Sequence, residues 1–384
     1  MPEIEEKKYW VRLSRACNNK CIFCLDYRSQ NNTVYSYNYL CKKIKNGFNA
    51  SADYKQRLIL SGGEPTINPN FIKAVEYGKK LGFDKIQTIT NGRMFCYKKF
   101  ISQAKKAGLD EITFSLHGHN SSLHDKLVCI KGAFKQAVSG LKNALALKFI
   151  VNVDIVINKK NFKELLEIIK FYHQLGVHEF DLLTIMPYGR AWDLNFDQLF
   201  YNLDEFKPIF EQVLDYGRAN NIVLWYNRFP VNYFENYEHL IKDIEKKLYY
   251  EIFGERKKEF ERFLSKGKRL NCLNLKCCEL CFIKDFCAQL SYFNNFIKQS
   301  RPMVEIFSQP FCLTSDNYKT VQLANLLNDN GLDLDKFYNF YLENLHSYKS
   351  LRCRECFYFN RCRGLDYNSI LKNGFKILKP IRNE

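Results

Sequence analysis

The sequence contains no stretch of 18 consecutive apolar residues, so no membrane-spanning helix is expected. Its first ten residues, MPEIEEKKYW, are charged and lack the apolar core of a secretory signal. Basic residues form neither an Arg-rich tail nor a dense block, although 58 Lys and Arg outnumber 41 Asp and Glu. These absences predict a cytoplasmic protein without a membrane partner. Nucleic acid remains a possible partner but is not favoured.

The composition is that of a globular protein, with 46% hydrophobic and 26% charged residues. The 32 Phe and 24 Tyr residues supply apolar surface for a large core. Intrinsic disorder, collagen and coiled coil are therefore excluded as descriptions of the whole chain. A length of 384 residues predicts two or three domains.

Strand-like and helix-like segments alternate between residues 8 and 190. Strands are expected at 9–14, 57–61, 85–90, 111–116, 150–157 and 179–185. Helices are expected at 35–46, 71–81, 97–107, 133–147 and 162–175, with a further helix at 203–220 and a possible last strand at 222–227. This alternation predicts an α/β fold built from βαβ units around a parallel sheet.

Three regions are expected along the chain. The first, residues 1–230, holds the alternating segments, and residues 231–270 have the charged, helical pattern of a bridging helix pair broken at Gly254. The third, residues 271–384, is punctuated by cysteines and has an irregular pattern.

Fifteen cysteines are many for a cytoplasmic chain, in which disulfides are not expected. Most of them gather at 17–24, 272–287 and 353–362, a grouping that indicates metal or iron–sulfur ligation. Cys41, Cys96 and Cys129 stand apart and are expected to be small buried hydrophobic residues.

Cys17, Cys21 and Cys24 form a C-x3-C-x2-C motif after the first expected strand. Three thiolates can hold three irons of a [4Fe–4S] cluster and leave the fourth iron open to another ligand. Zinc is the alternative, but it requires a fourth Cys or His, and none lies within 15 residues on either side. Further polar motifs, SGGEP at 61–65, TNG at 90–92 and SLHG at 115–118, follow later strands, at the edge where barrel-like α/β folds build active sites.

The motif CNNKCIFC, followed by SGGEP, TNG and SLHG, resembles the radical SAM superfamily over about residues 8–190. The resemblance implies a partial (β/α)6 TIM-like barrel in which Cys17, Cys21 and Cys24 bind a catalytic [4Fe–4S] cluster. It also implies reductive cleavage of S-adenosylmethionine to a 5′-deoxyadenosyl radical, which abstracts hydrogen from a substrate. The implied cofactor-binding residues are Phe23 at the adenine, Gly62, Gly63, Glu64 and Pro65 at the methionine amine, Ser115 at the ribose, and Thr90, Asn91 and Asn158 at the same edge. For the last four, a strand-end turn or cap is the alternative.

Two segments near the C-terminus share the pattern C-x2-C-F-x4-C-x2-L. The first contains Cys278, Cys281 and Cys287, and the second contains Cys353, Cys356 and Cys362. The pattern resembles the SPASM extension, which implies two auxiliary [4Fe–4S] clusters, although Asp366 stands where that extension has a further cysteine. Cys272, Cys277 and Cys312 are available as additional ligands. Zinc knuckles are the alternative.

A peptide or protein substrate, as in maturation of a ribosomal peptide, is the leading expectation from this resemblance. A small-molecule or cofactor-building reaction and RNA modification are alternatives within enzymes. A zinc-binding interaction protein is the alternative from another class. The resemblance further implies an electron donor such as flavodoxin or ferredoxin. No residue is assigned as the catalytic acid or base, because His117, Tyr188 and Asp366 have no visible partner in the sequence.

Overall fold

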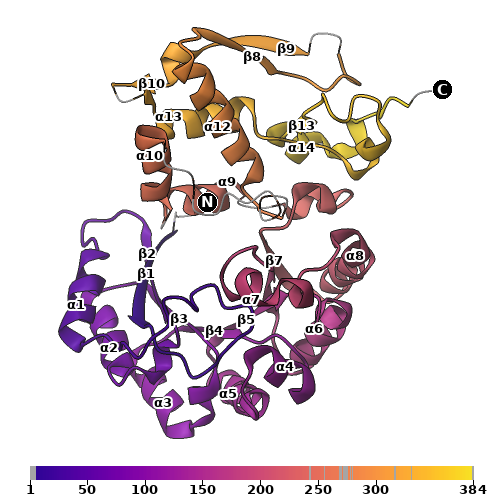
Figure 1. The fold of residues 1–384 in the computed structure, drawn as a ribbon. Coiled ribbons are helices and arrows are strands. Elements are labelled where there is room, and N and C mark those ends of the chain that lie inside the picture. Colours follow the sequence, from indigo (N-terminus) through magenta and orange to yellow (C-terminus); the bar gives the residue numbers. More distant parts are fainter. Residues whose placement is uncertain are drawn as a thin grey trace. The chain divides into compact units, whose positions relative to one another are not determined.

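The computed structural model describes residues 6–241, 244–254, 256–267, 270, 276, 278, 280–314, 317–329 and 331–382. The chain divides into two compact units, Met1–Asn227 and Arg228–Glu384. Figure 1 shows the first unit in indigo to magenta and the second in red to yellow.

The first unit is built on a seven-stranded sheet in which each strand pairs in parallel with the next one along the chain. The strands are β1 (Glu6–Ser14), β2 (Lys55–Gly62), β3 (Lys85–Thr90), β4 (Glu111–Ser115), β5 (Ile150–Ile157), β6 (Glu179–Thr184) and β7 (Val223–Asn227). The sequential order and uniform direction confirm the predicted α/β fold and partial barrel, and β7 is the last strand that the sequence left as a possibility.

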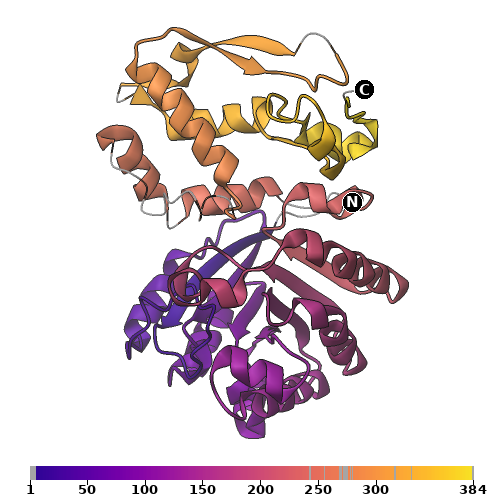
Figure 2. The ribbon, with the colours of Figure 1, turned by 45° about the vertical axis from the view of Figure 1, so that its right-hand side comes forward.

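Helices of this unit cover the outer side of these strands, apart from the helix at residues 189–199, whose start lies against the backbone of Cys24 and Leu25 (Figures 1 and 2). They are α1 (Tyr37–Asn46), α2 (Phe71–Leu81), α3 (Lys98–Ala107), α4 (Ser121–Val128), α5 (Ala133–Ala146), α6 (Leu165–Gln174), α7 (Gly189–Leu199) and α8 (Leu203–Ala219). Two of them, α4 and α7, were not expected from the sequence. The first begins where the Asn120 side chain accepts a hydrogen bond from the Leu123 N–H, which is an ordinary N-cap.

The strands alternate between a helix-facing side and an inner side that carries polar groups. In β5, Val151, Val153 and Ile155 are buried, whereas Asn152 and Asp154 alternate with them and therefore point to the opposite side. This alternation places a polar lining inside the barrel while the apolar residues form the interface with the helices.

A buried ion pair crosses the inner side of the barrel from β1 to β5. The Arg57 guanidinium pairs with Glu6 at 2.9 Å and with Glu111. It also donates to Gln87 Oε1 at 3.1 Å, while Asn152 Nδ2 donates to Glu111 Oε1 at 3.0 Å. These side chains tie five neighbouring strands together through polar contacts that are shielded from water.

The second unit combines helices with short antiparallel ladders. Its elements are α9 (Ile244–Phe253), α10 (Lys257–Lys266), α12 (Lys284–Lys298), β8 (Met303–Phe307), β9 (Tyr318–Gln322), β10 (Leu327–Asn328), β11 (Gly331–Leu332), α13 (Leu334–Asn344), β12 (Ser347–Tyr348), β13 (Leu365–Asp366) and α14 (Tyr367–Asn373). Phe260, Phe286, Phe293 and Phe337 are fully buried in its core. Gly254 lies between α9 and α10, where the sequence predicts a break.

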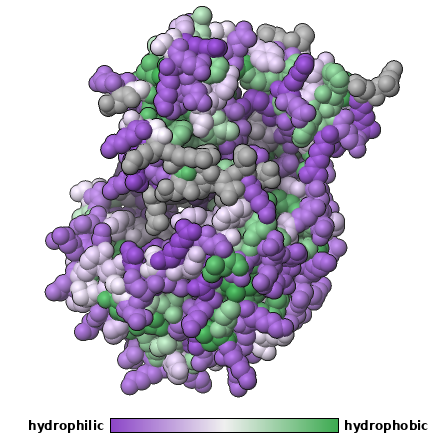
Figure 3. Space-filling model, viewed as in Figure 1, coloured by the Kyte–Doolittle hydropathy of each residue, from purple (hydrophilic) through white to green (hydrophobic). Residues whose placement is uncertain are grey.

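The visible face of the molecule is largely hydrophilic, with scattered apolar side chains (Figure 3). Within the described residues, no helix combines the length and the hydrophobicity of a membrane-spanning segment.

The expectation that the isolated cysteines are buried is wrong. Cys129 is exposed because it caps the C-terminal end of α4 with a positive φ of 55°, and Cys41 and Cys96 are only partly buried.

We expect Arg57→Met to destabilise the first unit by about 3–5 kcal/mol, because it leaves the Glu111 carboxylate buried without its cation. The side chains of Arg57 and Glu111 are only 11% and 7% exposed. Urea unfolding measures the loss, and adding Glu111→Gln to the variant should recover part of it. Arg218→Met is the matched control, because Arg218 and its partner Asp215 are 63% and 62% exposed. A loss as small as that of the control would contradict a structural role for the ion pair.

Candidate functional site

The loop that carries Cys17, Cys21 and Cys24 leaves β1 and is held from both sides by backbone hydrogen bonds. The Lys20 and Ile22 N–H groups donate to the carbonyls of residues 128 and 127 at 2.9 and 3.0 Å. The Arg190 N–H donates to the Cys24 carbonyl at 2.9 Å. The end of α4 and the start of α7 therefore fix this loop.

Side chains that follow β3 reach the same loop. Arg93 donates to the Asn18 carbonyl and, at 3.0 Å, to Asn19 Oδ1. Asn91 Nδ2 donates to Asn18 Oδ1 at 2.6 Å. The TNG segment and the cysteine loop thus meet at the carboxyl edge of the barrel, where both are expected from the sequence.

The three thiols of the loop lie in a shielded environment. Burial raises the pKa of Cys17 to about 12 and also raises the pKa values of Cys21 and Cys24. The Asn19 N–H lies 3.4 Å from Cys17 Sγ, and Gln30 Nε2 lies 3.3 Å from Cys24 Sγ. Buried thiols of this kind are poor nucleophiles, whereas a metal deprotonates a coordinating thiol, so the donor set fits iron ligation.

Two glycines allow the end of β2 to lie against the start of the cysteine loop. A Cβ on Gly62 would come within 2.5 Å of the Ser14 carbonyl oxygen, and one on Gly63 within 2.3 Å of the Ala16 oxygen. The Gly63 N–H donates to Ser14 O at 2.8 Å, and the Glu64 N–H donates to Ala16 O at 2.8 Å. Any side chain at either glycine would push apart the two segments.

The Glu64 carboxylate connects the ends of β2 and β3 and is 1% exposed. Its Oε1 accepts from the Thr66 N–H and hydroxyl and from the Thr90 hydroxyl, at 3.0, 2.5 and 2.6 Å. Its Oε2 accepts from the Asn91 N–H at 2.8 Å. Burial raises the pKa of Glu64, and these hydrogen bonds oppose that shift.

Phe23 is 7% exposed and meets the His117 ring edge-on at a centroid distance of 4.7 Å. His117 Nδ1 accepts from the Val156 N–H at 3.2 Å. Burial lowers the pKa of His117, so the ring is neutral and its Nε2 carries the proton. His117 therefore supports Phe23 rather than presenting itself as a base.

The remaining predicted cofactor residues lie at the same edge of the barrel but differ in their local structure. Pro65 begins a short 3-10 turn, Pro65–Ile67, and Ser115 ends β4. Asn158 is fully buried in the turn after β5, where its Oδ1 accepts from the Lys160 N–H and its Nδ2 donates to the Val156 carbonyl, both at 3.0 Å. The Asn158 amide is thus engaged within its own turn.

Two carboxylates on the inner side of the barrel were not singled out from the sequence. Asn227 Nδ2 lies 2.6 Å from both oxygens of Asp181. Asp181 of β6 and Asp154 of β5 are neighbours in the register of the parallel sheet. Burial, followed by the charge of Asp181, raises the pKa of Asp154 well above its usual range. The signal was present, since Asn152 and Asp154 interrupt an otherwise apolar strand.

Four cysteines of the second unit line one pocket: Cys312, Cys353, Cys356 and Cys362. Burial, together with the smaller effect of the charges of the other three cysteines, raises the pKa of Cys353 to about 11. The Gly364 N–H lies 3.3 Å from Cys362 Sγ. The pocket thus brings Cys312 to the second cysteine repeat from 41 residues upstream of Cys353.

Among the described residues, no three Cys, His, Asp or Glu side chains converge closely enough to hold a single metal ion. A zinc ion requires its thiolates about 2.3 Å from one centre, whereas a cuboidal cluster spreads them over separate irons. The pocket offers four thiols, the number that a tetrahedral zinc ion and a closed cuboidal cluster both take.

The two cysteine repeats have the same backbone hydrogen-bond pattern. In the first, the N–H groups of Cys281, Lys284 and Cys287 donate to the carbonyls of residues 278, 281 and 283 at 3.1 Å. In the second, the groups 75 positions later, at 356, 359 and 362, donate to the carbonyls of 353, 356 and 358 at 3.0, 2.9 and 2.8 Å. The two segments thus share these hydrogen-bonded turns, although Cys287 lies in α12 and Cys362 lies in non-helical backbone. Cys272 and Cys277 lie outside the described residues.

Asp366 has a different role from a cluster ligand, since its Oδ1 accepts from the Ser369 N–H at 2.9 Å and caps α14. It is not among the residues that line the cysteine pocket. Gly364 is needed nearby, because a Cβ there would lie 2.2 Å from the Tyr348 carbonyl oxygen. The motif's glycine therefore lets β12 approach the cysteine loop.

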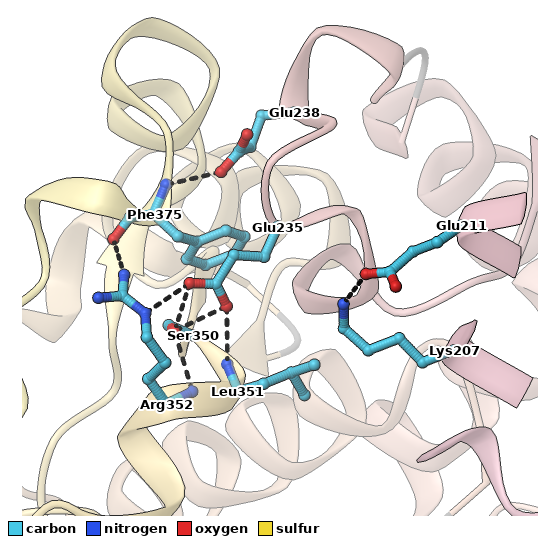
Figure 4. A network of polar contacts seen from close by, with 8 residues as sticks. All are labelled: Lys207, Glu211, Glu235, Glu238, Ser350, Leu351, Arg352 and Phe375. Carbon is cyan, nitrogen blue, oxygen red and sulfur yellow. Dashed lines mark hydrogen bonds and ion pairs between the residues drawn. The ribbon is translucent and has the colours of Figure 1, made fainter. Parts of the chain in front are cut away.

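Glu235 anchors the start of this loop (Figure 4). Its carboxylate is 8% exposed as a residue and accepts from the Ser350 hydroxyl at 2.8 Å, the Leu351 N–H at 3.3 Å and Arg352 Nε at 2.7 Å. The Cys353 N–H in turn donates to the Ser350 carbonyl at 3.0 Å. A buried, satisfied carboxylate thus fixes the backbone that presents Cys353.

Comparison with known proteins supports the sequence resemblance for the first unit. Residues 11–172 match the protein family described as the radical SAM superfamily. A probable GTP 3′,8-cyclase from Saccharolobus solfataricus is 30% identical over 183 residues, which cover 47% of this chain and 57% of that protein. An AdoMet-dependent heme synthase from Methanosarcina barkeri is 25% identical over 180 residues, 47% of this chain and 50% of that protein. The chain spans about half the length of these curated relatives, 57% and 50%.

Solved structures with a similar arrangement include Streptococcus suis SuiB bound to its precursor peptide SuiA, at 18% identity and a TM-score of 0.48. That match covers 62% of this chain and 52% of SuiB. AnSMEcpe with bound AdoMet and the Kp18Cys peptide matches at 14% identity and a TM-score of 0.48, over 97% of this chain and 96% of that chain. The family match lies over the cysteine loop, the glycine segment and the first five strands, so residues 11–172 are similar to the radical SAM superfamily.

Proposed function

We propose that the chain is a radical SAM enzyme that carries auxiliary iron–sulfur clusters and acts on a peptide or protein. When bound, the catalytic cluster supplies the electron that cleaves S-adenosylmethionine to a 5′-deoxyadenosyl radical, which takes hydrogen from a substrate carbon. The observation that carries this proposal is the shielded three-thiol loop, clamped at the carboxyl edge of the barrel by the glycine and TNG segments.

In this proposal Cys17, Cys21 and Cys24 hold three irons. Phe23 lies against the adenine, and the backbone of Gly62 and Gly63 lets the methionine part approach closely. Each carboxylate oxygen has about two lone-pair sites, and Glu64 Oε2 accepts the Asn91 N–H among the described residues, so its second site can accept from the methionine ammonium.

The remaining predicted cofactor residues have supporting roles. Pro65 shapes the turn that follows Glu64, and Thr90 and Asn91 orient the Glu64 carboxylate. Ser115 faces the ribose from the end of β4. Asn158 shapes the turn after β5 and acts through that backbone.

The second unit would hold two auxiliary clusters. Cys312, Cys353, Cys356 and Cys362 supply four thiolates for one cluster, which is the number that a closed [4Fe–4S] cluster requires. The repeated backbone pattern around Cys278, Cys281 and Cys287 supports a second cluster, with Cys272 and Cys277 as candidates for its remaining ligand. A flavodoxin or ferredoxin is the proposed electron donor.

The substrate class rests on the paired cysteine modules and on the SPASM-like pattern that they form. A small nucleotide is the second candidate, because the first unit shares 30% identity with a protein named as a probable GTP 3′,8-cyclase. Anaerobic assays of 5′-deoxyadenosine formation with peptides encoded beside this gene, and separately with GTP, distinguish the two. Stimulation by GTP alone would contradict the peptide assignment.

We expect replacement of Cys17, Cys21 and Cys24 together by Ala to abolish 5′-deoxyadenosine formation, because these thiols are the proposed iron ligands. Iron bound by the second unit should remain. Chromatographic measurement of 5′-deoxyadenosine and iron analysis of anaerobically reconstituted protein test both points. Cys41→Ala is the control, since Cys41 lies on α1, outside the loop. Undiminished product in the triple variant would rule out the assignment.

Iron content tests the auxiliary clusters. The reconstituted chain should hold about twelve irons, and the Cys353→Ala, Cys356→Ala, Cys362→Ala variant about eight. Cys312→Ala should release or convert the same cluster, because its thiol lines the same pocket. About eight irons in the wild type and four after removal of either repeat would indicate one shared cluster instead. Zinc in place of iron would contradict the auxiliary-cluster assignment.

Glu235→Gln should accelerate the loss of iron to a chelator from the cluster held by Cys312 and the second cysteine repeat. The substitution weakens the charge-assisted hydrogen bonds that fix residues 350–353. We expect about 1.5–3 kcal/mol of lost interaction, or roughly a tenfold to hundredfold faster loss if the loop must open first. Glu211→Gln is the control, since Glu211 pairs with Lys207 within α8 of the first unit (Figure 4). Equal rates in both variants would argue against the anchoring role.

A further inference from the structure

A lysine lies in the wall of the cysteine pocket. Lys349 lines the pocket together with Cys312, Cys353, Cys356 and Cys362. Its ammonium donates to the Phe359 carbonyl at 2.5 Å and lies 4.1 Å from the centre of the Phe359 ring. Lysine ammonium groups are strongly hydrated and usually extend into water, so this placement is unusual.

The backbone fixes Lys349 in this position. It directly follows β12, whose residues Ser347 and Tyr348 pair with Asp366 and Leu365 of β13. A Cβ on Gly364 would lie 2.7 Å from the Lys349 nitrogen atom, so the two backbones are in close contact two residues after Cys362. The lysine is thus anchored at its backbone and at its ammonium, and it cannot swing away without losing the bond to Phe359.

We propose that Lys349 raises the reduction potential of the iron–sulfur cluster held by Cys312 and the second cysteine repeat. This inference rests on the proposed function, which supplies the cluster. Reduction adds one electron from the external donor and breaks no bond, so the cluster becomes more negative by one charge. A fixed cation in a partly desolvated wall stabilises the more negative state, and nearby charge is one of the factors that set such potentials.

A purely structural role for Lys349 predicts a different outcome. In that case the bond to Phe359 matters only because it holds the loop, and loss of the charge would change iron retention rather than potential. Lys349→Arg keeps the positive charge. Lys349→Met removes the charge but keeps much of the aliphatic stem. Comparison of the two variants therefore separates charge from packing.

The test is an EPR-monitored redox titration of the full-length reconstituted protein. The signal of the cluster held by Cys312 and the second cysteine repeat is identified by its loss from the Cys353→Ala, Cys356→Ala, Cys362→Ala variant. We expect Lys349→Met to hold wild-type iron and to shift this potential to a more negative value, with Lys349→Arg close to the wild type. Lys336→Met is the matched control, because its ammonium also donates to a backbone carbonyl, that of Leu327 at 2.6 Å, and it does not line the pocket.

An unchanged potential in Lys349→Met, or an equal shift in Lys349→Arg, would overturn the inference. If Lys349→Met loses iron, Lys349→Gln takes its place, and iron loss from both neutral variants would assign Lys349 a structural role instead. A wild-type protein without iron at the C-terminal cysteines would overturn the auxiliary-cluster proposal together with this inference. An intact wild-type signal that is insensitive to Lys349 would overturn the inference alone.

Discussion

The close approach of two backbones, the end of β2 and the end of β1, is the constraint on which the candidate site depends. Two hydrogen bonds of 2.8 Å join residues 63 and 64 to residues 14 and 16, immediately before Cys17. Only glycine at positions 62 and 63 leaves room for these bonds. The chain therefore enters the cysteine loop at a fixed position, and every other contact of the loop builds on that position.

A single buried carboxylate extends this constraint to β3. Glu64 begins at the β2 edge and accepts from Thr90 and Asn91 at the β3 edge, and Asn91 then reaches Asn18 in the cysteine loop. A buried carboxylate is tolerated only where donors surround it, so this arrangement also fixes the donors. The motifs SGGEP and TNG thus work as one structural unit although Gly63 and Asn91 are 28 positions apart in the sequence.

The sequence was sufficient for features that depend on local pattern. Strand alternation predicted β1 to β6, and cysteine spacing predicted the N-terminal loop. It was insufficient where residues distant in the chain meet, since nothing in the local pattern brings Cys312 to Cys353 or Glu235 to Ser350. The sequence did not predict α12 either, because this helix is stabilised by packing its apolar side chains into a core that forms only when the unit folds.

On the proposed function, the two kinds of cysteine site differ in how many thiolates they offer. The N-terminal loop offers three, with no further Cys or His within 15 residues, so one iron remains open to S-adenosylmethionine. The C-terminal pocket offers four, so its cluster is closed and is suited to electron transfer rather than to ligand binding. For a closed cluster the protein acts on the reduction potential through electrostatics, so a lysine held in the wall of that pocket can influence function.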